Sequence, residues 1–180
     1  ARVTGKTRGN VILRDRQYTS SKDEKRSLEI SKNCISGKVY NARWVLERAI
    51  RDHAMQIDKE RVKVASLQLK TFLQYIQNAE SKEQLRGYEG EAASIYFSVF
   101  DELILQQKKD FSFHGRSKRP PMDNVNAMLS FVYTLLTNQI TSALESVGLD
   151  PCVGYLHTER PGRASLASDL IEEFRAVYAD

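Results

Sequence analysis

Apolar residues recur along most of this chain at the three- and four-residue spacing of an α-helix. The first such stripe follows Lys22 and consists of Ile35, Val39, Ala42, Leu46, Ala49 and Ile50. Because residues at these spacings share one side of a helix, the stripe predicts a helix with one buried face. The same pattern predicts helices over Lys59 to Gln77, from Asp123 to Gly148, and over about Ser165 to Tyr178. No strand pattern of any length follows residue 20, so the expected fold class is mainly α.

A further helix is expected after Ser81, where the sequence begins with a capping-box pattern and continues to about Gln107. Two glycines in this helix, Gly87 and Gly90, flank Glu89. A glycine inside a helix costs about 1 kcal/mol relative to alanine. The pair therefore indicates that something approaches the backbone closely here, either a neighbouring helix or a ligand.

The first residues have a different character. Residues 1–10 are turn-rich, and Val11-Ile12-Leu13 is a short apolar run that suits a strand. We therefore expect residues 1–21 to be the end of a strand-rich domain with its linker, and residues 22–180 to be a helical domain. The chain starts at Ala1 rather than Met and stops directly after a helix-like run, so we expect a piece of a longer protein, incomplete at its C-terminal end.

Composition narrows the class of protein without choosing a function. Of the 180 residues, 41% are hydrophobic and 28% charged, values typical of a soluble globular protein. No uninterrupted apolar run reaches the roughly 20 residues that a membrane helix needs, so we expect no membrane association. Two cysteines are too few for a disulfide scaffold, which favours a cytoplasmic location.

Charge is divided unevenly. Residues 1–70 hold 17 Lys and Arg against 8 Asp and Glu, a net of +9, and residues 71–180 hold 10 against 15, a net of −5. A basic half next to an acidic half suggests a surface for polyanions beside a carboxylate site. The basic residues off the first apolar stripe, on a face suited to phosphates, are Lys38, Arg43, Arg48 and Arg51. The loop 108–122, either a phosphate-gripping loop or a solvated connection, adds Arg116, Lys118 and Arg119.

Three residues from separate elements can supply metal ligands, namely Glu89, His157 and Asp169. Carboxylate and imidazole donors together suit Mg²⁺ or Mn²⁺, and the imidazole favours Mn²⁺. Such an ion polarises a phosphoryl oxygen and activates a hydroxyl or water. A lone histidine beside a turn is more often structural, so the residues alone leave both interpretations open. Asp169, Glu172 and Glu173 also crowd one helix face, where like charges repel unless a cation or water compensates.

Four segments, in order, resemble one known family. They are Arg86 to Ala93, Lys118 to Tyr133, Gly154 to Thr158 and Ser165 to Arg175, with weaker matches at Gly9 to Arg14, Gln17 and Gly37 to Asn41. The family is the CRISPR-associated integrase-nuclease, the catalytic subunit of the spacer-acquisition complex. The resemblance covers nearly the whole chain. It implies an all-helical catalytic domain that follows a β-domain, together with further C-terminal helices.

The resemblance also implies a site and a reaction. Glu89, His157 and Asp169 match the family's metal-binding and catalytic residues, and Glu91 and Glu172 match positions behind them. The sequence departs from the pattern of some relatives at Leu166, where those relatives carry a second acidic residue. The candidate DNA contacts are Arg86, Arg116, Lys118 and Arg119.

The family's reaction is attack by the 3′-hydroxyl of a short foreign DNA on a phosphodiester of the CRISPR array, or hydrolysis when water attacks. The implied partners are DNA in double-stranded, branched or single-stranded form, a second copy of the chain and a small companion protein. The alternative is a non-catalytic DNA-binding or assembly module of the same scaffold.

Overall fold

The computed structural model describes residues 10–157 and 160–180. These residues form six α-helices, one short 3-10 helix and no strand, which confirms the mainly α fold class. The elements are α1 (Val11–Lys22), α2 (Glu24–His53), α3 (Lys59–Gln77), α4 (Lys82–Ser98), η1 (Phe100–Leu103), α5 (Asn124–Val147) and α6 (Ser165–Tyr178). Among the described residues, no helix is both long enough and apolar enough to cross a membrane.

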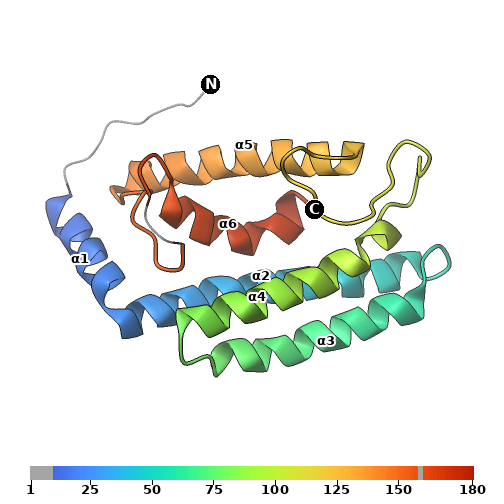
Figure 1. Ribbon diagram of the computed structural model, residues 1–180, viewed down its shortest axis with the longest axis horizontal. Coiled ribbons are helices and arrows are strands. Elements are labelled where there is room, and N and C mark those ends of the chain that lie inside the picture. The colour runs from blue at the N-terminus through green and yellow to red at the C-terminus, as the bar shows by residue number, and fades with distance from the viewer. Residues whose placement is uncertain (1–9, 158–159) are drawn as a thin grey trace.

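Helix α2 is the centre of the packing, because it contacts α1, α3, α4 and α6. Its apolar stripe forms the core with residues of α3 and α4, including Ile35, Leu46, Leu69, Ile76 and Leu85, which are fully buried. Figure 1 shows α5 and α6 side by side along one side of this core, with α3 on the opposite side. Helix α6 therefore lies between α5 and α2, where its acidic residues can meet side chains of the central helix.

Most helix limits agree with the sequence patterns. Helix α3 has the predicted bounds, and α5 begins after Asp123, whose carboxylate accepts a hydrogen bond from the backbone N–H of Asn126 at 2.7 Å. Gly148 ends α5 in the left-handed conformation with a φ of 89°, as a C-terminal glycine does. The prediction that α4 continues to about Gln107 is wrong, because α4 ends at Ser98.

The early end of α4 has a packing cause. The chain turns there into η1, and the ring of Phe100 packs against Phe113 with 4.9 Å between centroids. The carboxylate of Asp101 then accepts a hydrogen bond from the backbone N–H of Phe113 at 2.9 Å. These contacts fold the following segment back onto α4, which a continuous helix would prevent.

The predicted strand at Val11-Ile12-Leu13 is also wrong, because these residues begin α1. The side chain of Asn10 caps this helix by accepting a hydrogen bond from the backbone N–H of Leu13 at 3.1 Å. A helix satisfies its backbone groups locally, whereas a strand needs a partner strand. Residues 1–9 lie outside the described residues, and the division of the chain at residues 21 and 22 stays a prediction.

Candidate functional site

The segment that carries His157 connects α5 to α6 and is held in shape by side chains from other helices. Gln17 of α1, a buried residue, donates to the carbonyl of Asp150 at 2.8 Å and accepts from the backbone N–H of the same residue at 2.9 Å. Ser27 of α2 donates to the carbonyl of Tyr155 at 3.0 Å. Arg86 of α4 donates to the carbonyl of Leu156 at 2.6 Å. Arg86, predicted as a DNA contact, therefore also holds the backbone of the His157 segment.

Asp169 of α6 fixes the same segment from the other side. Its carboxylate accepts backbone N–H groups from Tyr155, Leu156 and His157 at 2.6, 3.0 and 2.9 Å, and lies 2.6 Å from Nδ1 of the His157 ring. The side chain is only 1% exposed. Both oxygens of Asp169 are therefore already used. Because Nδ1 of His157 faces this carboxylate, Nε2 is the ring nitrogen that points away from it. A Cβ atom at Gly154 would lie 2.8 Å from this carboxylate, so only glycine lets the backbone at position 154 come this close to Asp169.

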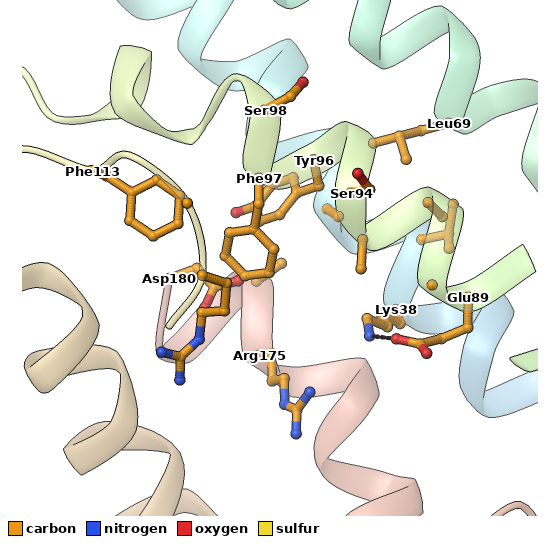
Figure 2. A pocket seen from close by; sticks show the side chains of 18 of the residues that line it. Lys38, Leu69, Glu89, Ser94, Tyr96, Phe97, Ser98, Phe113, Arg175 and Asp180 are labelled. Atoms are coloured by element: carbon orange, nitrogen blue, oxygen red, sulfur yellow. Dashed lines mark hydrogen bonds and ion pairs between the residues drawn. The ribbon is translucent and has the colours of Figure 1, made fainter. Parts of the chain in front are cut away.

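Glu89 and Glu172 meet a shared cation rather than Asp169. The ammonium of Lys38 contacts the Glu89 carboxylate, as Figure 2 shows, and lies 2.6 Å from Oε2 of Glu172. Burial would raise the pKa of Glu172, but the charges of Lys38, Arg175 and His157 hold it below its ordinary value. Burial likewise opposes the charge of Lys38, whose pKa is nevertheless raised by Glu172 and Glu89. Glu172 is thus kept ionised inside the protein.

The predicted ligands fall into two groups. His157 lies against Asp169, and Glu89 lies against Lys38, which also holds Glu172. Within residues 10–157 and 160–180, no three acidic, histidine or cysteine side chains are close enough to hold one ion without movement. The sequence suggests a position for Glu172 behind the ligands. Its shared cation with Glu89, and its electrostatic contact with His157, instead link the two groups.

The three acidic residues of α6 do not share one crowded surface. Asp169 is turned to the His157 segment, Glu172 to Lys38 and Arg175, and Glu173 to the backbone of α2. An added Cβ at Gly37 of α2 would lie 2.8 Å from Cγ of Glu173, which explains the glycine inside that helix. Cations and backbone donors therefore compensate the repulsion expected from the sequence.

A cavity of about 770 Å³ opens beside these carboxylates. Its lining includes Lys38, Glu89, Arg116, Lys118 and Arg175, and we call it the basic cavity. Burial and the charges of Arg175 and Arg116 lower the pKa of Lys118, and burial lowers that of Arg116. Cations that destabilise one another in this way are stabilised by an added anion.

Arg116 is held in place by a residue that the sequence analysis did not single out. Asn126, which is fully buried, accepts hydrogen bonds from Arg116 at 2.7 Å and from the backbone of Ser117 at 2.9 Å. The ring of Tyr133 lies under both guanidinium groups, with 5.4 Å to Arg116 and 4.8 Å to Arg175. Asn126 follows the N-cap of α5 by three positions, and no local pattern in the sequence shows that its side chain is buried.

The remaining candidates lie outside this centre. Glu91 is exposed, since two positions along a helix turn a side chain by about 200° away from Glu89. Arg119 is exposed on the loop. The predicted basic face of α2 is smaller than expected. Lys38 is nearly buried and Arg43 pairs with Glu47, whereas Arg48 and Arg51 stay exposed and share Asp52, so their role toward phosphate stays a prediction.

Gly87 and Gly90 have no close neighbour. A Cβ atom at either position would have no other atom within 4 Å among the described residues. Close helix packing is therefore not the reason for this pair. Gly90 lines the basic cavity instead, and the other interpretation from the sequence, approach of a ligand, stays a prediction.

Fold and site together define a helical domain in which a cluster of carboxylates around a lysine adjoins a cavity lined by basic side chains. The chain belongs to the Cas1 family, because the family model of CRISPR associated protein Cas1 matches residues 1–180. A CRISPR-associated endonuclease Cas1 from Chlorobaculum tepidum is 48% identical over 178 residues, which are 99% of this chain and 52% of that protein. The chain spans about half the length of such curated relatives.

Solved structures agree with this assignment. A casposase bound to integration product superposes with a TM-score of 0.79 and 29% identity, over 96% of this chain and 46% of that chain. A chain of a partial Cas6-RT-Cas1–Cas2 complex superposes with a TM-score of 0.75 and 27% identity, over 88% of this chain and 45% of that chain. The helical architecture is therefore shared with a casposase bound to integration product and with a chain from a complex that contains Cas2.

Proposed function

We propose that this chain supplies the catalytic site of a metal-dependent DNA endonuclease and integrase of CRISPR adaptation. The observation that carries the proposal is the pair of carboxylates, Glu89 and Glu172, around the ammonium of Lys38 at the basic cavity, together with the ring of His157 that Asp169 orients. Membership of the Cas1 family and similarity to a casposase bound to integration product support the same reaction.

The donor set fits a divalent ion such as Mg²⁺ or Mn²⁺. Glu89 and Glu172 already share a positive charge, and Nδ1 of His157 is bound by Asp169, which is the usual arrangement behind a metal-ligating histidine. We propose Glu89, His157 and Glu172 as the residues that hold the ion, with Asp169 as the residue that orients His157. A bound ion supplies Lewis-acid activation of the phosphodiester and a lower pKa for the attacking hydroxyl.

The other residues act on the DNA. Arg116, Lys118 and Arg175 line the basic cavity and hold phosphate groups of the substrate strands. Because Asn126 and Tyr133 fix the guanidinium of Arg116, the phosphate is positioned rather than only attracted. The 3′-hydroxyl oxygen of one DNA then forms a bond to phosphorus, and the bond from this phosphorus to the 3′-oxygen of the attacked strand breaks. When water attacks in place of the hydroxyl, the reaction is hydrolysis.

The partners follow from the same proposal. We infer that the protein binds branched, double-stranded or single-stranded DNA, pairs with a second copy and joins a small companion protein, in the cytoplasm. The similarity to a chain from a complex that contains Cas2 supports the companion. Residues 1–21 then connect the helical catalytic domain to a preceding β-domain.

The test is DNA strand cleavage and integration by the full-length protein with Mn²⁺. We expect His157→Ala to lower both activities by more than about 100-fold, because loss of a ligand should cost more than loss of a residue that only supports a ligand. The circular dichroism signal of the helices should be retained. His53→Ala, at the end of α2, is the matched control and should keep full activity. Wild-type rates in His157→Ala would contradict the proposed site, whereas a wild-type protein without Mn²⁺-dependent cleavage or integration would favour the non-catalytic module.

A further inference from the structure

Lys38 occupies the centre of the candidate site, although it comes from the helix with the main apolar stripe. Its ammonium joins Glu89 of α4 to Glu172 of α6. Only 13% of the side chain is exposed, and lysines are almost never so buried unless they are paired. Lys38 is therefore an internal counter-cation for the two carboxylates to which we assign a divalent ion.

An ammonium and a divalent ion require the same carboxylate oxygens. A positive charge a few ångströms from an ion also opposes its binding, and more strongly in a buried place than in water. We propose that Lys38 competes directly with the divalent ion for Glu89 and Glu172, and that the ion displaces it on binding. Lys38 thereby lowers the ion affinity of the site. This inference rests on the proposed function, because it concerns the same pair of carboxylates.

The displaced ammonium has a defined destination. It stays attached to α2 beside the basic cavity, which Arg116, Lys118 and Arg175 also line. A further positive charge thus becomes available to a phosphate group only when the ion is in place. Binding of the ion and binding of DNA phosphate then strengthen each other, and by thermodynamic reciprocity they do so by the same factor.

The first test is Mn²⁺ binding to the metal-free full-length protein, measured by titration calorimetry at neutral pH. Lys38→Met keeps an unbranched side chain and removes the charge, so we expect the affinity to rise about tenfold, which is about 1.4 kcal/mol. Lys63→Met is the matched control, because Lys63 pairs with Glu47 at 3.0 Å between α2 and α3. Its affinity should equal that of the wild type. Glu89→Gln should abolish binding and so identify the site.

The second test needs no variant. Lysines of the wild-type protein are acylated with and without Mn²⁺, and each modified residue is quantified by mass spectrometry. We expect the modification of Lys38 to increase severalfold as the ion site fills. Lys63 should not respond.

The outcomes separate the two proposals. Unchanged or weaker Mn²⁺ binding by Lys38→Met, at a site that Glu89→Gln abolishes, would overturn the competition and leave the proposed function intact. Labelling of Lys38 that does not respond to Mn²⁺ would overturn the competition as well, even if Lys38→Met failed to fold. A wild-type protein that binds no Mn²⁺ at these carboxylates would overturn both proposals.

Discussion

At the scale of single residues, neighbours divide the work among carboxylates that look alike in the sequence. Asp169 and Glu172 lie three positions apart on α6, yet Asp169 accepts three backbone N–H groups while Glu172 faces two cations. A carboxylate whose oxygens are fully hydrogen-bonded has little capacity left for an ion. Glu172 faces cations rather than backbone donors, so it can exchange one cation for another without breaking hydrogen bonds to the backbone.

This division predicts different effects for two substitutions. Glu172→Gln should remove most Mn²⁺ affinity, because a neutral amide oxygen is a poorer ligand for a hard cation. Asp169→Asn should weaken Mn²⁺ binding by only about 10- to 100-fold, through a misoriented His157. It should also destabilise the metal-free protein by about 2 kcal/mol, because the new amide N–H group faces backbone donors.

Calorimetric Mn²⁺ titration and thermal unfolding of the metal-free protein measure both effects. Glu173→Gln is the control, since Glu173 lies on the same helix and faces α2 rather than the cavity. If Asp169→Asn lost all Mn²⁺ binding while Glu172→Gln bound like the wild type, Asp169 would be the ligand, as the sequence suggests.

At the scale of helices, α2 is joined to α3 by a polar contact as well as by its core. Glu47 of α2 accepts hydrogen bonds from Ser66 at 2.5 Å and from Lys63 at 3.0 Å. The hydrogen bond from Ser66, followed by that from Lys63, holds the pKa of Glu47 below its ordinary value of 4.5 despite burial. Such a carboxyl stabilises the fold when ionised, and this contribution disappears as the pH falls through its pKa.

Glu47→Gln should therefore lower the free energy of unfolding by about 1 kcal/mol at neutral pH. The difference from the wild type should be complete above the ordinary pKa of 4.5 and should shrink as the pH falls below it, because the wild-type residue then becomes neutral too. Urea denaturation across this pH range measures the effect, with Glu29→Gln, exposed on the same helix, as the control. A difference that persisted in acid would mean that the contact acts by shape rather than charge.

The elements show what the sequence could and could not provide. Helix α3 and the ends of α5 were predictable, because their stripes and caps are local signals. The strand expected at residues 11–13 failed because three apolar residues fit either element, and the cap by Asn10 decided the outcome. Motifs identified Glu89, His157 and Asp169 as candidates. The pairing of Glu89 with Glu172 through Lys38 depends on three helices meeting, which no local pattern contains.

At the scale of the whole molecule, the basic side chains of α2 and those of the loop have different surroundings. Arg43, Arg48 and Arg51 are paired with acidic residues, whereas Arg116 and Lys118 line the basic cavity and have no ion pair among the described residues. We therefore expect DNA affinity to depend on this cavity and its loop rather than on α2.

Replacing Lys118 and Arg119 together with Gln should weaken DNA binding equally on all sequences. It should also flatten the plot of log affinity against log salt by about 0.9 for each duplex phosphate that the variant no longer neutralises. The double replacement of Arg48 and Arg51 removes the same charge from residues paired with Asp52, and should change the slope less. Fluorescence anisotropy over a series of salt concentrations measures these slopes. Equal slopes for both variants would mean that the loop is only a connection.

The hydrogen bonds of several helices to the His157 segment have a consequence for the order in which the candidate site can form. Gln17, Ser27 and Arg86 are synthesised early, but the carboxylate that completes their hold, Asp169, belongs to the last helix. A chain still emerging from the ribosome thus has Glu89 but neither an oriented imidazole nor Glu172. The candidate site therefore forms only after α6 has been made and has folded against the His157 segment.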